Sequence, residues 1–550
     1  MPQAQVVIWS LAFLATPGLL LPIQFATSSL HVDGSPESIA RALNTFRLFF
    51  ITLTMTGIGF VALFIWDGVF PDRRDARILT PLPVPGRVLI GARLLALGTL
   101  CAIFIVGINA FPTVFYAPTI THFGGAANQV QGLLAFVLVN AFAGIFVFAT
   151  LVFLQGLALN LGGRTAADRL SVVMQVLFVA ALLQMIFYMT QVAAMLPIDL
   201  ASGNLRAMPS VWFLGLYDVI GGRSVAGAPL LAALALAVTV STAAGAILLF
   251  VSTHARLTRR ALESRDVTSA RRIPSLPGMA ERLLFSPVAC AVFGFTVRSL
   301  ARSRSHRLLM AMYVGIALAL VASAIVPVAI REGLAGFARP SVELLSAPLV
   351  LSFFTLVGMR VALAIPIEPK ANWVFRVREP PDRIAAMSGV RAAMLFVGVL
   401  PTTVMGFVTA ASLWGFRPAL AHSAICATMG MLLAEILMVR LRKLPFTCTY
   451  FPGNSRVGTL WPLYLTGFGT YAYTVAAWQA VFMVRARPVV MFLSVVGLAV
   501  LLFAFLRRRY LREIPSLVFS ETDPSALFEG FHLSEALAAR PAASGSGRET

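Results

Sequence analysis

The stretch Phe46-Arg-Leu-Phe-Phe-Ile-Thr-Leu-Thr-Met-Thr-Gly-Ile-Gly-Phe-Val-Ala-Leu-Phe-Ile-Trp66 decides the fold class of this chain. Its one charged residue is Arg47, next to its start, and the other residues are apolar or weakly polar. A helix of this length crosses the roughly 30 Å hydrocarbon core of a bilayer, and its internal hydrogen bonds satisfy the backbone where water is absent. The stretch therefore predicts a membrane-spanning helix.

Similar apolar stretches occur along the whole chain, which has 550 residues, 58% of them hydrophobic and only 12% charged. This composition excludes an ordinary soluble protein. We expect an all-α integral membrane protein with about twelve transmembrane helices. The predicted spans are 6–26, 46–66, 94–114, 133–154, 170–193, 229–251, 308–330, 344–365, 392–413, 419–439, 460–484 and 489–506.

Basic residues indicate the orientation of these spans. When alternate loops are assigned to opposite sides, one side receives 33 of the 43 Lys and Arg residues. Because loops rich in Lys and Arg stay in the cytoplasm, both termini are predicted to be cytoplasmic. We expect a multi-pass protein of the cell (cytoplasmic) membrane. Anionic lipid headgroups account for the net charge of +20, so no nucleic-acid partner is needed.

The spans divide into two sets of six. Residues 1–266 are predicted to form a first bundle, 267–285 a cytoplasmic linker, 286–506 an amphipathic helix with a second bundle, and 507–550 a cytoplasmic tail, partly disordered. Shifting the sequence by 298 residues aligns Pro71 with Pro369, Pro83 with Pro381, Gly91 with Gly389 and Arg93 with Arg391. These identities fall in the second cytoplasmic loop of each half, which makes a duplicated six-span unit a hypothesis.

The loop after the second span concentrates charge in a chain where charge is scarce. A charged cluster is followed by a proline-rich segment that favours a stiff, extended backbone. We interpret this loop, with the related segment 369–391, as a docking surface for a soluble partner. Anchoring of the arginines to anionic lipid is the alternative. The predicted docking residues are Asp72, Arg73, Arg74, Asp75, Arg77, Pro81, Pro83, Arg376 and Arg378.

Two further segments have an amphipathic character. Residues 286–304 alternate apolar side chains with arginines, as expected for a helix in the headgroup layer that leads into the seventh span. Residues 209–222 are too apolar for an open loop and too short to span a bilayer. They predict an interfacial or re-entrant hairpin on the outer face, with Trp212 and Tyr217 at the interface.

Charged residues within the predicted spans are few. Arg360 and Glu435 lie at similar depths in the eighth and tenth spans, where they could pair across the bundle, or Arg360 could extend to the headgroups. Polar amides elsewhere in the spans predict hydrogen bonds between helices, with a polar substrate lining as the alternative. These amides are Asn109, Asn140, Asn160, Gln175, Gln184 and Gln191.

The sequence contains no motif that would indicate an enzyme. A Gly-x-x-x-x-Gly-Lys-Ser/Thr phosphate loop is absent, and the histidines and the four cysteines show no metal-ligand spacing. We therefore predict no enzymatic activity, no cofactor and no metal in this chain. The cysteines are interpreted as small apolar residues.

Three segments together resemble the permease subunits of bacterial ATP-binding cassette exporters of the type-2 class: 71–83, 209–217 and 295–307. The resemblance implies that a separate ATP-binding subunit contacts the cytoplasmic loop and the amphipathic helix, and that substrate passes between two six-span bundles. The chain departs from that family in two ways. No amphipathic helix precedes the first span, and the last external loop has no counterpart of the 209–222 hairpin.

Two other functions stay open. Major-facilitator transporters also have six plus six spans, and Gly68-Val-Phe-Pro-Asp72-Arg73 matches their Gly-x-x-x-Asp-Arg motif. However, the Gly-Arg pair that follows in that family is replaced here by Asp75-Ala-Arg77, and midplane carboxylates for proton coupling are lacking. The second alternative is a membrane scaffold that transports nothing.

Overall fold

A computed structural model describes residues 35–70, 83–123, 129–195, 208–263, 286–367, 382–439, 441, 445–446, 466–484 and 488–512. This part of the chain is 91% helical and contains no β-strand. The prediction of an all-α protein is confirmed for these residues.

Nine helices in the described ranges are long and apolar enough to cross a membrane. They correspond to the second through the tenth predicted spans. The predicted span 6–26 lies outside the described residues. Helix Val475–Val484 covers part of the eleventh predicted span, and helix Pro488–Arg512 contains the whole of the twelfth. The structure thus describes a membrane protein with several spanning helices, and the count of twelve and the position of the termini stay predictions.

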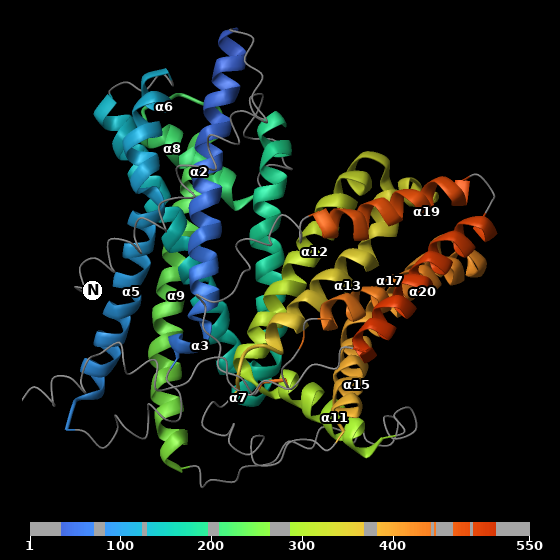
Figure 1. The fold of residues 1–550 in the computed structure, drawn as a ribbon. Helices are drawn as coiled ribbons and strands as arrows, with labels where there is room; N and C mark the ends of the chain where they lie inside the picture. The colour runs from blue at the N-terminus through green and yellow to red at the C-terminus, as the bar shows by residue number, and fades with distance from the viewer. Residues whose placement is uncertain are drawn as a thin grey trace, which may run out of the picture. The chain divides into compact units, whose positions relative to one another are not determined.

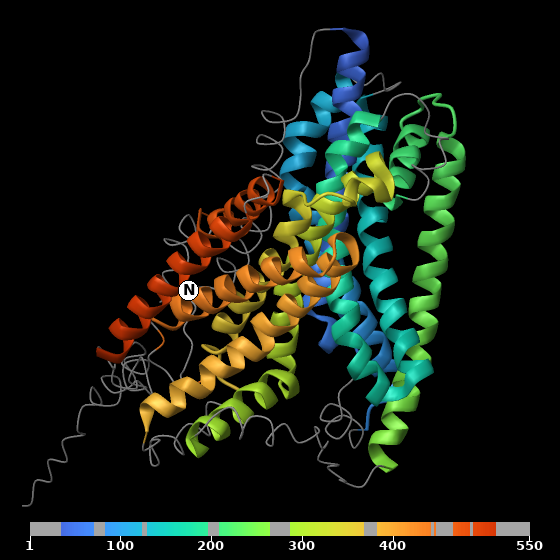
Figure 2. The same ribbon diagram turned by 90° about the vertical axis from the view of Figure 1, so that its right-hand side faces the viewer.

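The helices form two compact units (Figures 1 and 2). Unit 1 comprises residues 1–271 and 315–326, and unit 2 comprises residues 272–314 and 327–550. Each unit is described separately below.

Unit 1 is built around a long helical segment, α7, that packs against both α2 and α9. Helix α2 begins with a cap, because the Ser35 side chain accepts a hydrogen bond from the Ser38 backbone N–H at 3.2 Å. The elements are α2 (Pro36–Phe64), α3 (Trp66–Val69), α5 (Gly86–Phe111), η1 (Pro112–Tyr116), α6 (Ala117–Phe123), α7 (Gln129–Met195), α8 (Pro209–Ile220) and α9 (Ala228–Glu263).

The backbone of α7 stays helical while the chain reverses its direction. In its first part, Asn140 contacts Thr54 and Gln155 contacts Trp66, so this part runs in the same direction as α2. Its second part runs in the opposite direction to α2, because Phe178 packs on Trp66 and the carbonyl oxygen of Leu182, further along α7, accepts a hydrogen bond from Thr56, earlier in α2. The turn lies beside the α7 label in Figure 1. The fourth and fifth predicted spans are therefore antiparallel, although no open loop separates them.

Glycines bring these helices close together. A Cβ atom added to Gly57 would lie 2.6 Å from Ile108 of α5, and one added to Gly59 would lie 2.6 Å from Leu182 of α7. A larger residue at either position would have to displace the side chain of Ile108 or Leu182. Gly57 and Gly59 therefore allow close packing of these helices.

Unit 2 contains a short helix, α11, and a single residue separates its end from the start of α12. The break is Ser303, whose backbone is extended. Helices α16 and α17 are separated in the same way by Gly415, whose φ of 87° is readily adopted only by glycine. The elements are α11 (Pro287–Arg302), α12 (Arg304–Glu332, of which residues 315–326 belong to unit 1), η3 (Gly333–Phe337), α13 (Val342–Ala362), α15 (Arg383–Met394), η5 (Leu395–Val399), α16 (Leu400–Trp414), α17 (Phe416–Met438), η7 (Thr470–Thr474), α19 (Val475–Val484) and α20 (Pro488–Arg512).

Helix α11 coincides with the amphipathic helix predicted over residues 286–304, and one of its faces packs on α15. The buried face consists of Ala289, Phe293, Thr296 and Leu300, which recur at helical spacing. The backbones approach most closely at Gly389 of α15, where an added Cβ would lie 2.4 Å from the Ala289 carbonyl oxygen. The contact fixes α11 at the start of the ninth predicted span.

Candidate functional site

The predicted docking loop falls largely outside the described residues. This applies to Asp72, Arg73, Arg74, Asp75, Arg77, Pro81, Arg376 and Arg378. Pro83 is described and is exposed, two residues before the proline that precedes α5. The two flanks of the loop are joined, because Arg93 of α5 donates to the carbonyl oxygen of Gly68 at 2.9 Å. A force that acts on the loop would therefore be transmitted to both α3 and α5.

We call this end of unit 1, where α2 ends and α5 begins, the loop end. Polar side chains tie the helices together there. Gln155 of α7 donates to the carbonyl oxygen of Trp66 at 2.7 Å, and Asn160 of α7 donates to the hydroxyl of Thr253 in α9. These bonds join α3, α7 and α9 just below the loop.

Deeper in unit 1, a polar cluster joins three helices. The hydroxyl of Thr54 in α2 lies 3.1 Å from the Oδ1 atoms of both Asn109 in α5 and Asn140 in α7. All three side chains are buried. The prediction that amides join neighbouring helices is confirmed for Asn109, Asn140 and Asn160. Gln191 lies outside the residues with described side chains, and the buried amide atoms of Gln184 have no hydrogen-bond partner among the described residues.

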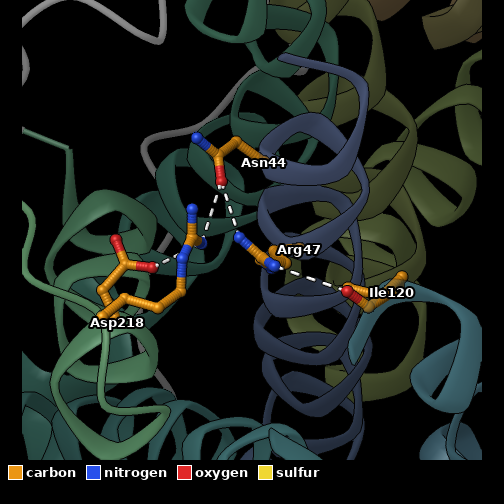
Figure 3. A network of polar contacts seen from close by, with 5 residues as sticks. Asn44, Arg47, Ile120 and Asp218 are labelled. Carbon is orange, nitrogen blue, oxygen red and sulfur yellow. Dashed lines mark hydrogen bonds and ion pairs between the residues drawn. The ribbon is translucent and has the colours of Figure 1, made fainter. Parts of the chain in front are cut away.

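At the opposite end of unit 1, which we call the hairpin end, α8 rests against α2, α7 and α9. Arg47 of α2 lies there and is only 1% exposed. Its Nη1 donates to Oδ1 of Asn44 at 2.8 Å, and its Nη2 donates to the Ile120 carbonyl at 3.5 Å (Figure 3). The guanidinium also lies over the ring of Tyr217, with 4.9 Å between its central carbon and the ring centre.

A second arginine completes this cluster. Arg223, in the turn after α8, donates to Asp218 at 2.9 Å and to the same Asn44 oxygen at 3.5 Å (Figure 3). Asn44 thus accepts from two guanidinium groups at once. Since Asp218 and Tyr217 belong to α8 and Asn44 and Arg47 to α2, the cluster fixes the short helix on the second predicted span.

Burial decides the protonation of Asp218, which is only 2% exposed. Loss of solvent raises the pKa of its carboxyl group to about 6, and the positive charge of Arg47 offsets only part of this increase. The carboxyl group can therefore change its charge near neutral pH.

The structure places Tyr217 inside the protein, and its position at the membrane interface stays a prediction. Tyr217 is only 3% exposed and contacts Arg47. Trp212 lies against Phe146 of α7, with 6.1 Å between ring centres. Eight of the residues of α8 are buried in the protein (Ser210, Val211, Phe213, Leu214, Gly215, Leu216, Tyr217 and Asp218). The helix is apolar because it packs against other helices.

The predicted pairing of Arg360 with Glu435 is also corrected. Glu435 of α17 forms its ion pair with Arg391 of α15 at 2.9 Å, and Arg507 of α20 lies 3.8 Å away. Arg360 of α13 instead donates to the carbonyl oxygen of Leu437 at 3.1 Å. The carboxylate therefore joins α15, α17 and α20 at the end of unit 2 where α13 ends and α15 begins, which we call the loop end of unit 2.

The local sequence does not single out Arg47 and Arg391 as members of these clusters. An arginine inside an apolar helix is the one available signal, since burying it requires partners. Except for Asn44, which is close to Arg47 in the chain, these partners are far away in the sequence.

No group of metal-ligating side chains occurs in the part of the chain that the structure describes. Comparisons with protein-family models, with curated proteins and with solved structures find no match to this chain.

Proposed function

We propose that this chain is the membrane-spanning permease of an ATP-binding cassette transporter, and that it exports a substrate with energy from a separate ATPase subunit. The observation that carries the proposal is the arrangement of α11. It is a separate amphipathic helix that stops at Ser303, directly before a spanning helix, and it packs on α15, which begins within the 369–391 segment. Force applied by a soluble partner on this segment would reach α11 through α15.

Two other observations support the proposal. The first is the hydrogen bond from Arg93 to the carbonyl oxygen of Gly68, which connects the two flanks of the charged loop so that they would move together. The second is α8, a short apolar helix between the fifth and sixth predicted spans that is held by the Arg47 cluster. The ATPase would dock on 72–77, Pro81, Pro83 and the related loop with Arg376 and Arg378, on the cytoplasmic face of the cell membrane. The chain itself would hold no nucleotide.

Charge reversal at Arg73 and Arg74 tests the docking surface. We expect the double variant R73E/R74E to insert in the membrane normally and to lose co-purification with the ATPase. The matched control is R417E, at an exposed position in the first turn of α17, opposite the loop end of unit 2, which should keep the ATPase. If R73E/R74E binds the ATPase and stimulates ATP hydrolysis as the wild type does, the docking surface is wrong and lipid anchoring explains the arginines.

A secondary transporter of the major-facilitator type is the second candidate, and one observation favours it. His422 of α17 is only 2% exposed, and its Nδ1 lies 2.7 Å from Oε1 of Gln479 in α19. Ionisable residues inside spans serve as proton relays in some transporters. Proton flux into ATP-depleted vesicles under an imposed pH gradient, lost in H422F, would support this candidate over the permease.

A further inference from the structure

His306, in the first turn of α12, is only 1% exposed and makes two hydrogen bonds. Its Nε2 lies 3.0 Å from the carbonyl oxygen of Ile365, and its Nδ1 lies 2.6 Å from the hydroxyl of Ser303. Because a carbonyl oxygen can only accept, Nε2 carries a proton and donates it to Ile365. In the neutral ring, Nδ1 then accepts from Ser303. The ring is held in one orientation by both of its nitrogens.

Phe446 packs on the same ring. The two ring centres are 4.9 Å apart, edge to face, and Phe446 also meets Phe295 of α11 with 5.8 Å between centres. The backbone N–H of Phe446 donates to the Leu363 carbonyl at 3.1 Å. Phe446 has a φ of 64°, which a bulky side chain rarely adopts and which marks a backbone held by its surroundings.

These contacts join three segments at the loop end of unit 2. Ser303 is the break between α11 and α12, Ile365 follows the end of α13, and Phe446 follows the end of α17. Ile365 lies directly before the segment that contains Arg376 and Arg378, and Phe446 lies in the basic loop 440–457. A displacement of either loop must therefore move the ring of His306 or break its bonds.

We propose that His306 is a positioning residue that transmits displacement of the 367–391 loop to α11 and α12. The inference rests on the proposed function, because the displacement would come from the docked ATPase. Transmission depends on the Nε2 donor, since this atom holds the segment that leads into the loop. Ser303 and Phe446 fix the ring so that the donor stays aimed at Ile365.

Two near-isosteric substitutions separate this role from packing. In H306Q the side-chain amide nitrogen lies near the position of the histidine Nε2 and can donate to Ile365. In H306N the shorter amide reaches only the position of Nδ1. Both variants lose the aromatic contact with Phe446. H306N keeps a polar group at the Nδ1 position, where Ser303 bonds, and H306Q does not, so a larger loss in H306N than in H306Q assigns the effect to the Ile365 bond.

The experiment uses the complex of this chain with its ATPase, purified from its own cells and reconstituted in liposomes. Hydrogen exchange is measured with and without ATP plus orthovanadate, which holds the ATPase closed. In the wild type and H306Q we expect changed exchange both in 367–391 and in 295–310. In H306N the change in 367–391 should persist, while the change in 295–310 should fall at least threefold at an equal melting temperature.

An H306N complex that transmits the change to 295–310 as fully as the wild type would overturn the inference. If H306N does not fold, H306F serves instead, because it keeps an aromatic ring beside Phe446 and removes the Nε2 donor. H306F should reduce the change in 295–310, and an undiminished change would likewise overturn the inference. A wild-type chain that co-purifies with no ATPase would instead count against the proposed function.

Discussion

The guanidinium carbon of Arg47 lies 4.9 Å from the centre of the Tyr217 ring and so joins α2 to the short helix α8. The same guanidinium bonds to Asn44 and to the Ile120 carbonyl, so three segments meet at one buried charge. A cation this deeply buried is stable only while its partners hold it. The hairpin end of unit 1 is therefore sensitive to small changes at Tyr217 and Asp218.

Replacing Tyr217 tests the contact with Arg47. We expect Y217L to lose about 2 kcal/mol of stability, because a desolvated cation–π contact and part of the buried ring are removed. The matched control is Y217F, which keeps the ring. The Tyr217 hydroxyl has no hydrogen-bond partner among the described residues, so Y217F should stay within about 0.5 kcal/mol of the wild type. Melting temperatures in detergent micelles measure both. Equal losses in the two variants would show that the ring face plays no part.

Stability should depend on pH through Asp218. Burial raises its pKa to about 6 in the folded protein, against about 3.9 for an unperturbed aspartate. Because the folded state binds the proton more tightly, the stabilisation is complete below about pH 4 and is lost as the pH rises through about 6. Its upper limit is about 3 kcal/mol, from 1.36 kcal/mol per pKa unit.

The variant D218N isolates this effect, since its side chain cannot titrate. We expect the melting temperature of the wild type, relative to that of D218N, to rise as the pH falls from 7 to 4. A difference that stays constant over this range would contradict the raised pKa.

Removing Arg391 should destabilise unit 2 strongly. In R391L the buried carboxylate of Glu435 loses its closest cation, which we expect to cost about 3 kcal/mol or more. The double variant R391L/E435L should recover part of the loss, because the buried carboxylate is removed together with its closest cation. R360L provides the comparison, since Arg360 contacts the Leu437 carbonyl and leaves the Glu435 pair intact. If thermal unfolding shows that R360L is less stable than R391L, the predicted pairing of Arg360 with Glu435 would be supported instead.

Gly389 and Gly91, which the 298-residue offset aligns, should respond differently to alanine. A Cβ on Gly389 would lie 2.4 Å from the Ala289 carbonyl oxygen, so G389A must push α11 away from α15. We expect a loss of about 2 kcal/mol, as for other overpacked contacts. No described atom lies within 4 Å of a Cβ on Gly91. G91A should therefore be neutral or gain up to about 1 kcal/mol from helix propensity. Similar losses in both variants would argue against the close contact at Gly389.

The sequence determined the helical class and nine of the spans, because an apolar stretch of sufficient length must satisfy its backbone within itself. It also located α11 and α8, whose lengths and composition differ from those of a span. The sequence predicts the position of the turn in α7, between 160 and 170, but it predicts a loop there and the structure has a helical backbone. Whether a chain turns with helical or open backbone depends on neighbours that local composition does not reveal.

Tertiary structure alone decided which charges meet. Arg47 pairs with α8, and Glu435 with Arg391 and Arg507, through residues far apart in the sequence. Similar depth made Arg360 a reasonable partner for Glu435, yet helix rotation directs the guanidinium of Arg360 to the Leu437 carbonyl. Depth follows from position along a helix and can be read from the sequence. Rotation about the helix axis follows from packing against other helices, which only the folded chain provides.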